Sequence, residues 1–134
     1  MKKIKLPDGT PTYCLKSAEA VVLDDHIKGY FNHGISIEEE DVVFDIGANI
    51  GVFGLRASQE YNNIEIHCFE PVPQIFEVLN CNVKLSLNPQ FYAYQMGLVL
   101  KMIRLVSHIS QIVPRYQHLI LNYGKKTLKL FKKQ

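Results

Sequence analysis

The fold of this chain is decided by the stretch VVFDIGANIG, residues 42–51. Residues 42–46 are mostly apolar and β-branched and show no alternation, which is typical of a strand buried on both faces of a parallel sheet. Small residues follow at once, with Gly47 and Gly51 at the ends of a short loop, and residues 52–59 fit a helix. The stretch therefore predicts a strand that turns sharply into a helix.

The segments on either side repeat this alternation of strand and helix. We expect a helix over about 17–32 with Ser17 as its N-cap, strands at 64–69 and 91–95, and a helix that begins at Pro73. Residues 6–13 are rich in turn-forming types and predict a loop or a short hairpin. Strands that alternate with helices indicate an α/β fold with a parallel sheet and right-handed crossovers.

Candidate binding residues gather where the first two strands of this sheet end. Ligands of open α/β sheets bind beyond the carboxyl ends of the strands. There Gly47 and Gly51 would let a ligand approach the backbone, and the following helix would offer N–H groups to it. Glu70 ends the second strand, 25 residues after Asp45, where an acid can accept hydrogen bonds from both hydroxyls of a ribose. The alternative is that the glycines only shape a sharp turn.

The spacing of the glycines separates two classes of ligand. A dinucleotide motif G-x-G-x-x-G would need glycine at 47, 49 and 52, whereas this chain has Asn49 and Val52. The G-x-x-x-G form, with Asp45 two residues before its first glycine, suits S-adenosylmethionine better, because that cofactor has no pyrophosphate to place against a second glycine. We therefore expect S-adenosylmethionine as the cofactor, and an NAD-type oxidoreductase domain is the alternative.

Residues 43–51, the Phe69-Glu70-Pro71 segment and an Asn at position 80 or 82 resemble the FkbM-type methyltransferase family. The resemblance covers about residues 18–97. It implies a class I, Rossmann-like fold that uses S-adenosylmethionine to methylate a hydroxyl of a small molecule or sugar. It also implies that Glu70 holds the ribose and that Ala48 contributes a backbone contact. The residues implied around the methionine portion of the cofactor are Asp45, Gly47, Asn49 and Gly51.

The charge distribution divides the chain near the end of this resemblance. Residues 1–77 hold all 13 acidic residues and 6 basic ones, a net charge of −7, whereas residues 78–134 hold no acid and 9 bases, a net charge of +9. The family carries a later Lys-x-Asp-x-Glu-Gly segment, and nothing here matches it. We therefore expect a partial cofactor-binding domain at 1–97, with an incomplete sheet left open at strand 91–95. A basic, helical tail at 98–134 lies outside the family pattern.

Three interpretations of the tail remain open. Its nine positive charges could bind an anionic membrane surface or nucleic acid, which would make the chain a non-catalytic basic module. The tail could instead be a helix that covers the sheet. The third interpretation is a change of reading frame near Gly97–Leu98, and the simultaneous loss of acids and family pattern favours it over a nucleic-acid or membrane partner. We therefore expect a truncated enzyme, without activity of its own, and assign no catalytic residue.

The remaining composition is that of an ordinary globular chain. With 134 residues and 47% apolar residues, it fits one domain. It contains no 18-residue apolar run and no apolar secretory signal, so the expected location is the cytoplasm. Its three cysteines lack metal-ligand spacing, and we expect no metal site. His67, inside an apolar strand, is expected to be a core histidine whose hydrogen bonds are satisfied.

Overall fold

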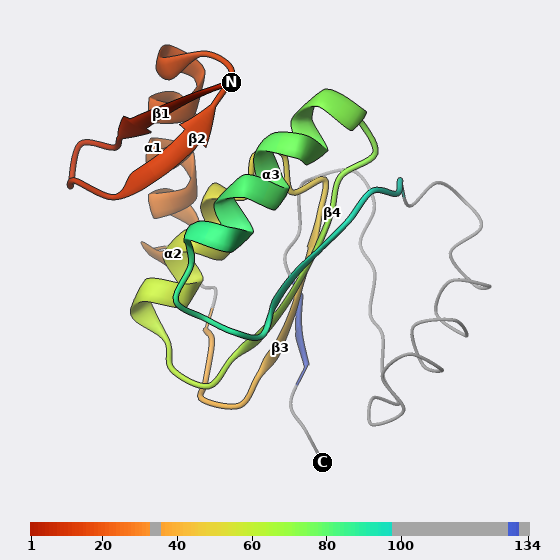
Figure 1. The fold of residues 1–134 in the computed structure, drawn as a ribbon. Helices are drawn as coiled ribbons and strands as arrows, with labels where there is room; N and C mark the ends of the chain where they lie inside the picture. The colour runs from red at the N-terminus through yellow and green to blue at the C-terminus, as the bar shows by residue number, and fades with distance from the viewer. Residues whose placement is uncertain (33–35, 98–128, 132–134) are drawn as a thin grey trace.

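A β-sheet with three helices packed on one of its sides forms the centre of the computed structural model, which describes residues 1–32, 36–97 and 129–131 (Figure 1). The helices are α1 (Ser17–Asn32), α2 (Val52–Glu60) and α3 (Pro73–Leu85). The strands are β1 (Lys2–Lys5), β2 (Pro11–Cys14), β3 (Val42–Ile46), β4 (Glu65–Phe69), β5 (Phe91–Tyr94) and β6 (Lys129–Phe131). The predicted helices and strands of residues 17–95 are thereby confirmed to within a few residues.

The sheet has the order β5-β4-β3-β6, and β3, β4 and β5 run parallel. Ile46 lies opposite Phe69, and Phe69 lies opposite Tyr94, so the three parallel strands end level with one another. This confirms the predicted parallel α/β sheet. The level ends also bring the loops after β3 and β4 to the same edge, which is where ligands of such sheets bind.

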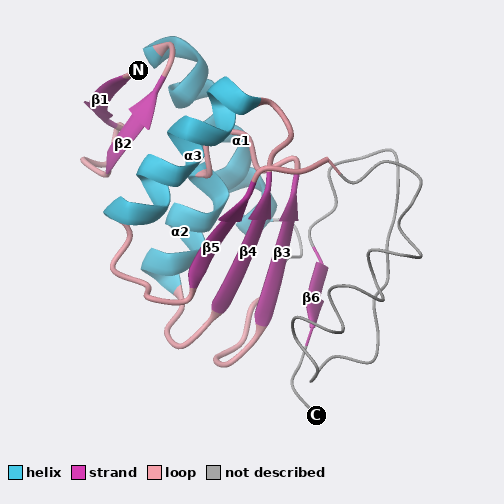
Figure 2. Cartoon of the chain, turned by 45° about the vertical axis from the view of Figure 1, so that its right-hand side comes forward, coloured by secondary structure: helices cyan, strands magenta, loops and turns pink. Residues whose placement is uncertain are grey.

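The three described helices all lie on one face of the sheet (Figure 2). Side chains alternate along a strand, so Val43 and Ile66 face the helices, where they belong to the main core with α1, α2 and α3. Val42, Phe44 and Phe69 form a second buried cluster on the opposite face. Strand β3 is therefore buried on both faces, as its uninterrupted apolar run predicts.

A hairpin of β1 and β2 precedes the helices and packs against α3. Its turn contains Gly9, whose φ of 90° lies in the left-handed region that glycine adopts most readily. Leu6 and Cys14 anchor the hairpin, because both are buried in the main core. Of the two predictions for this segment, loop or hairpin, the hairpin is confirmed.

Strand β6 differs from the expected helical tail. Lys129–Phe131 pairs antiparallel with β3, with Phe131 opposite Val42. The physical reason is that β3 would otherwise present a row of unpaired backbone groups at a sheet edge, and an extended segment satisfies them. The helical prediction is therefore wrong for these three residues. The rest of the tail, 98–128 and 132–134, and all three interpretations of it lie outside the described residues.

Within the part of the chain that the structure describes, β5 pairs on one side only, with β4. None of the described helices is both long and apolar enough to cross a lipid bilayer.

Candidate functional site

The loop that joins β3 to α2 is held against the end of β4. The backbone N–H groups of Gly47 and Ala48 both donate to the carbonyl oxygen of Phe69, at 2.9 and 3.0 Å. Three of the five loop residues have positive φ: 73° at Gly47, 54° at Asn49 and 81° at Gly51. This unusual backbone is what the small residues of the motif permit, so the predicted sharp turn is confirmed.

The two glycines of this loop serve different purposes. A Cβ atom on Gly51 would lie 2.5 Å from Cδ1 of Leu79, so glycine at this position lets α3 pack against the loop. A Cβ on Gly47 would meet no atom within 4 Å. The backbone of Gly47 is therefore open to an approaching ligand, whereas the role of Gly51 is in packing.

Glu70 is buried at the end of β4 and holds the loop from the side. Its Oε2 accepts a hydrogen bond from the backbone N–H of Asn49 at 3.0 Å, and its Oε1 accepts one from Val72 at 2.9 Å. A carboxylate has about four acceptor sites in all, so these two bonds leave capacity for ligand hydroxyls. The structure thus brings Glu70 and Asn49 together, although 21 positions separate them.

Asp45 lies inside β3, beneath the loop. It is buried opposite Cys68, whose Sγ lies 3.7 Å from the Asp45 Oδ2. Burial, together with this neighbouring carboxylate, raises the pKa of the Cys68 thiol well above its usual value. Cys68 is therefore a neutral thiol that can donate to Asp45, and this contact helps to hold the carboxylate in place.

Asn82 on α3 connects this loop to the N-terminal hairpin. Its fully buried side chain donates to the carbonyl oxygen of Ile50 at 2.6 Å and to that of Tyr13 at 3.0 Å, and accepts from the Tyr13 N–H at 2.7 Å. The sequence placed a family asparagine at position 80 or 82, and the structure gives position 82 these contacts. One amide thus satisfies three backbone groups from two separate segments.

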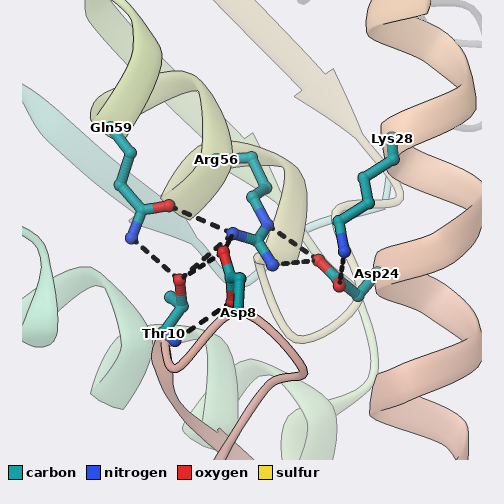
Figure 3. Close-up of polar contacts among 6 residues, drawn as sticks. All are labelled: Asp8, Thr10, Asp24, Lys28, Arg56 and Gln59. Carbon is teal, nitrogen blue, oxygen red and sulfur yellow. Dashed lines mark hydrogen bonds and ion pairs between the residues drawn. The ribbon is translucent and has the colours of Figure 1, made fainter.

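A charged cluster that joins α2 to the hairpin turn and to α1 was not foreseen from the sequence (Figure 3). Arg56 of α2 is buried, donates from Nε to Asp24 Oδ1 at 2.7 Å, and forms an ion pair with Asp8 in the hairpin turn. Lys28 contacts the other oxygen of Asp24 at 2.8 Å. Burial lowers the pKa of Arg56, but its bonds to the two acids outweigh this and raise it. The available signal was the one basic residue of α2, which stands between the apolar residues Leu55 and Ala57.

His67 is the core histidine that the sequence predicts. It is buried, with Nδ1 3.0 Å from the Tyr94 hydroxyl and Nε2 2.8 Å from Glu65. Burial lowers the pKa of His67, and the Glu65 carboxylate opposes that effect without cancelling it. The ring is therefore neutral at pH 7 and satisfied by protein partners. It lies in the sheet rather than in the loops that form the candidate site.

Parallel strands in the order β5-β4-β3, with a positive-φ glycine loop and a buried acid at their carboxyl ends, form a mixed α/β segment that fits a Rossmann-like fold. Such segments bind nucleotides or nucleoside-containing cofactors at this edge. The fold alone does not distinguish among the enzymes that share it.

Comparison with curated proteins gives the class more narrowly. The chain is 38% identical over 85 residues to the 31-O-demethyl-FK506 methyltransferase FkbM of Streptomyces tacrolimicus. It is 28% identical over 101 residues to Methyltransferase 1 of Beauveria bassiana, and 41% identical over 44 residues to the methyltransferase sdnD of Sordaria araneosa. No protein-family model matches the chain. These relatives confirm the resemblance of its N-terminal segment to FkbM-type methyltransferases.

The matched regions cover only part of each relative. They span 61% of this chain but 33% of the Streptomyces protein, and 73% of this chain but 41% of the Beauveria protein. For the Sordaria protein the shares are 33% and 17%. The chain thus spans well under half the length of the curated relatives it matches.

Proposed function

We propose that residues 1–97 form the S-adenosylmethionine-binding part of a methyltransferase that acts on a hydroxyl of a small molecule or sugar. The observation that carries this proposal is the contact between the glycine-rich loop and Glu70. The open backbone of Gly47 and the buried carboxylate of Glu70 lie at the same sheet edge, joined through the Asn49 N–H at 3.0 Å. The named methyltransferase relatives support the same class of reaction.

The residues at this edge suit the chemistry of the proposed cofactor. S-adenosylmethionine supplies a methyl group on a positively charged sulfur, and its ribose carries two hydroxyls. The Glu70 carboxylate, with acceptor capacity beyond its two backbone bonds, would hold those hydroxyls. The open space at the Cα of Gly47 would let the cofactor pack against the backbone, and Ala48 would orient the loop through its bond to Phe69.

The loop is less suited to a dinucleotide. In G-x-G-x-x-G sites the second glycine lets a pyrophosphate approach the backbone. Here that position is Asn49, whose side-chain Oδ1 accepts the N–H of Ile50 at 2.8 Å. The N–H group of Asn49 itself is bonded to Glu70. Both donors that would face a pyrophosphate at this point are therefore already bonded, which favours a cofactor without phosphates.

Calorimetry on the full chain tests this proposal. We expect binding of S-adenosylhomocysteine, the product form of the cofactor, and no binding of NAD. Glu70→Gln should weaken S-adenosylhomocysteine binding by at least about tenfold, because a charge-assisted bond to a hydroxyl is replaced by a neutral one.

Glu77→Gln is the matched control, since it makes the same change on the exposed surface of α3 and should leave the affinity unchanged. Circular dichroism of each variant checks that the fold is kept. Binding of NAD in place of S-adenosylhomocysteine would contradict the proposal, and so would equal affinities of the Glu70 and Glu77 variants.

A further inference from the structure

A cavity of about 450 Å³ lies beside the glycine-rich loop. It is bounded by the segment that leads from β2 into α1, by the first turns of α1, and by the loop residues Asn49 and Ile50. Ile75, in the first turn of α3, closes another side. The volume falls within the range of pockets that bind small molecules.

The walls of this cavity are mainly apolar. Leu15, Val22 and Leu23 line it from one side, and Ile50 and Ile75 line it from the other. Leu15 is 43% exposed and Val22 is 55% exposed, so the cavity gathers large apolar side chains that water still reaches. A ligand with a carbon skeleton would remove this apolar surface from water, which is favourable.

The polar groups that line the cavity are few. Lys16 and Glu19 pair with each other, with Nζ and Oε1 2.8 Å apart, and both side chains are exposed. His26 and Asn49 supply the other polar side chains among the described lining residues. A sugar would bring several hydroxyls into this space, and each one left without a partner would cost binding free energy. One hydroxyl on an apolar skeleton fits the same set of groups.

The cavity also adjoins the proposed cofactor site. Asn49 lines the cavity and donates its backbone N–H to Glu70. A molecule in the cavity would therefore lie next to the loop that holds the cofactor. This adjacency is what a methyl acceptor needs, because transfer requires the hydroxyl and the methyl donor to meet.

We propose that this cavity binds the carbon skeleton of the methyl acceptor, and that the acceptor is an alcohol on an apolar framework rather than a sugar. The proposal rests on the methyltransferase function proposed above, and it narrows the class of substrate. It assigns the wall formed by α1 and the β2–α1 segment to acceptor recognition.

The test uses the full chain and two alcohols of opposite polarity. The fluorescent probe 8-anilinonaphthalene-1-sulfonate reports apolar sites, and its displacement is followed with borneol, a bicyclic apolar alcohol, and with methyl glucoside. We expect borneol to displace the probe at concentrations at which methyl glucoside does not. Val22→Glu should weaken the borneol effect by about tenfold, because it places a charge against an apolar ligand.

Val21→Glu is the matched control. Val21 is the neighbouring residue of α1, is 39% exposed and does not line the cavity, so this variant should bind borneol as the unchanged chain does. Calorimetry with S-adenosylhomocysteine is run on both variants, and we expect the unchanged affinity in each.

The outcomes separate this proposal from the proposed function. Equal displacement by the two alcohols, or equal borneol binding by the two valine variants, would overturn the acceptor assignment. Loss of S-adenosylhomocysteine affinity in Val22→Glu would overturn it too, because the cavity would then belong to the cofactor. If the unchanged chain bound borneol selectively but no S-adenosylhomocysteine, the methyltransferase function would fall, and the acceptor role with it. The apolar selectivity of the cavity would then stand alone.

Discussion

Asn82 and Tyr13 exchange two hydrogen bonds although 69 positions separate them in the chain. The Tyr13 N–H donates to Asn82 Oδ1 at 2.7 Å, and Asn82 Nδ2 donates to the Tyr13 carbonyl oxygen at 3.0 Å. The same amide nitrogen also donates to the carbonyl oxygen of Ile50 in the glycine-rich loop. One side chain thus fixes the hairpin, α3 and the candidate binding loop relative to one another.

Replacing Asn82 with alanine should destabilise the protein by about 3 kcal/mol, because three backbone groups, one buried and two partly buried, would lose their partner. Urea unfolding followed by circular dichroism measures this change. Asn80→Ala, at a half-buried position on the same helix, is the control and should shift stability by less than about 0.5 kcal/mol. Similar losses in the two variants would show that the bonds of Asn82 contribute no more than an ordinary helix position.

Gly51→Ala should destabilise the protein by about 2 kcal/mol, since a residue with a Cβ would have to adopt a left-handed backbone. The new Cβ would also meet Leu79 at 2.5 Å. Gly29→Ala provides the contrast, because Gly29 lies within α1 and a Cβ there meets nothing within 4 Å. That variant should gain about 0.5–1 kcal/mol from helix propensity. Thermal unfolding measures the change in stability of each variant. If both variants were stabilised, or both destabilised, this explanation of Gly51 would be refuted.

Asp8→Asn should destabilise the protein at neutral pH more than in acid. The hydrogen bond from Arg56 holds the pKa of Asp8 well below its ordinary value of 3.8. A carboxyl whose pKa is lowered by folding contributes stability that is complete above its ordinary pKa and declines as the pH falls toward the lowered one. Denaturation midpoints at about pH 6 and about pH 3 should therefore show a smaller difference between variant and unchanged protein at the lower pH.

The control for Asp8 is Asp25→Asn, on the exposed side of α1. Its effect should be small at both values of pH, because exposed charges contribute little to stability. A difference between Asp8→Asn and the unchanged protein that stayed constant from neutral to acid pH would contradict the role given to the Asp8–Arg56 pair.

The sequence predicts most of the central fold because the signals there are local. The apolar run of β3, the glycines that follow it and the proline at the start of α3 each specify their own backbone conformation. The placement of Glu70 at a strand end also follows from local pattern, together with the rule that parallel strands end at one edge. The structure adds that the Asn49 N–H connects the loop to this acid.

The remaining features depend on partners far apart in the chain. Arg56 meets Asp24 across 32 positions and Asp8 across 48, and no periodicity indicates either pairing. Strand β6 shows the same limit, because three residues have too little pattern to separate a strand from a helix, and pairing with β3 decides the matter. The cavity beside the loop is likewise formed by segments that meet only in the folded chain.

The hydrogen bonds of Asn82 also constrain the order of events during synthesis. The hairpin of β1 and β2 leaves the ribosome before the helices and the sheet, yet the residue that fixes it to the core is made 69 positions after Tyr13. Contacts between distant positions form late, because the loop between them must first be closed. The hairpin is therefore held in place only after α3 has emerged, and until then the nascent chain exposes the apolar side chains that the hairpin later buries.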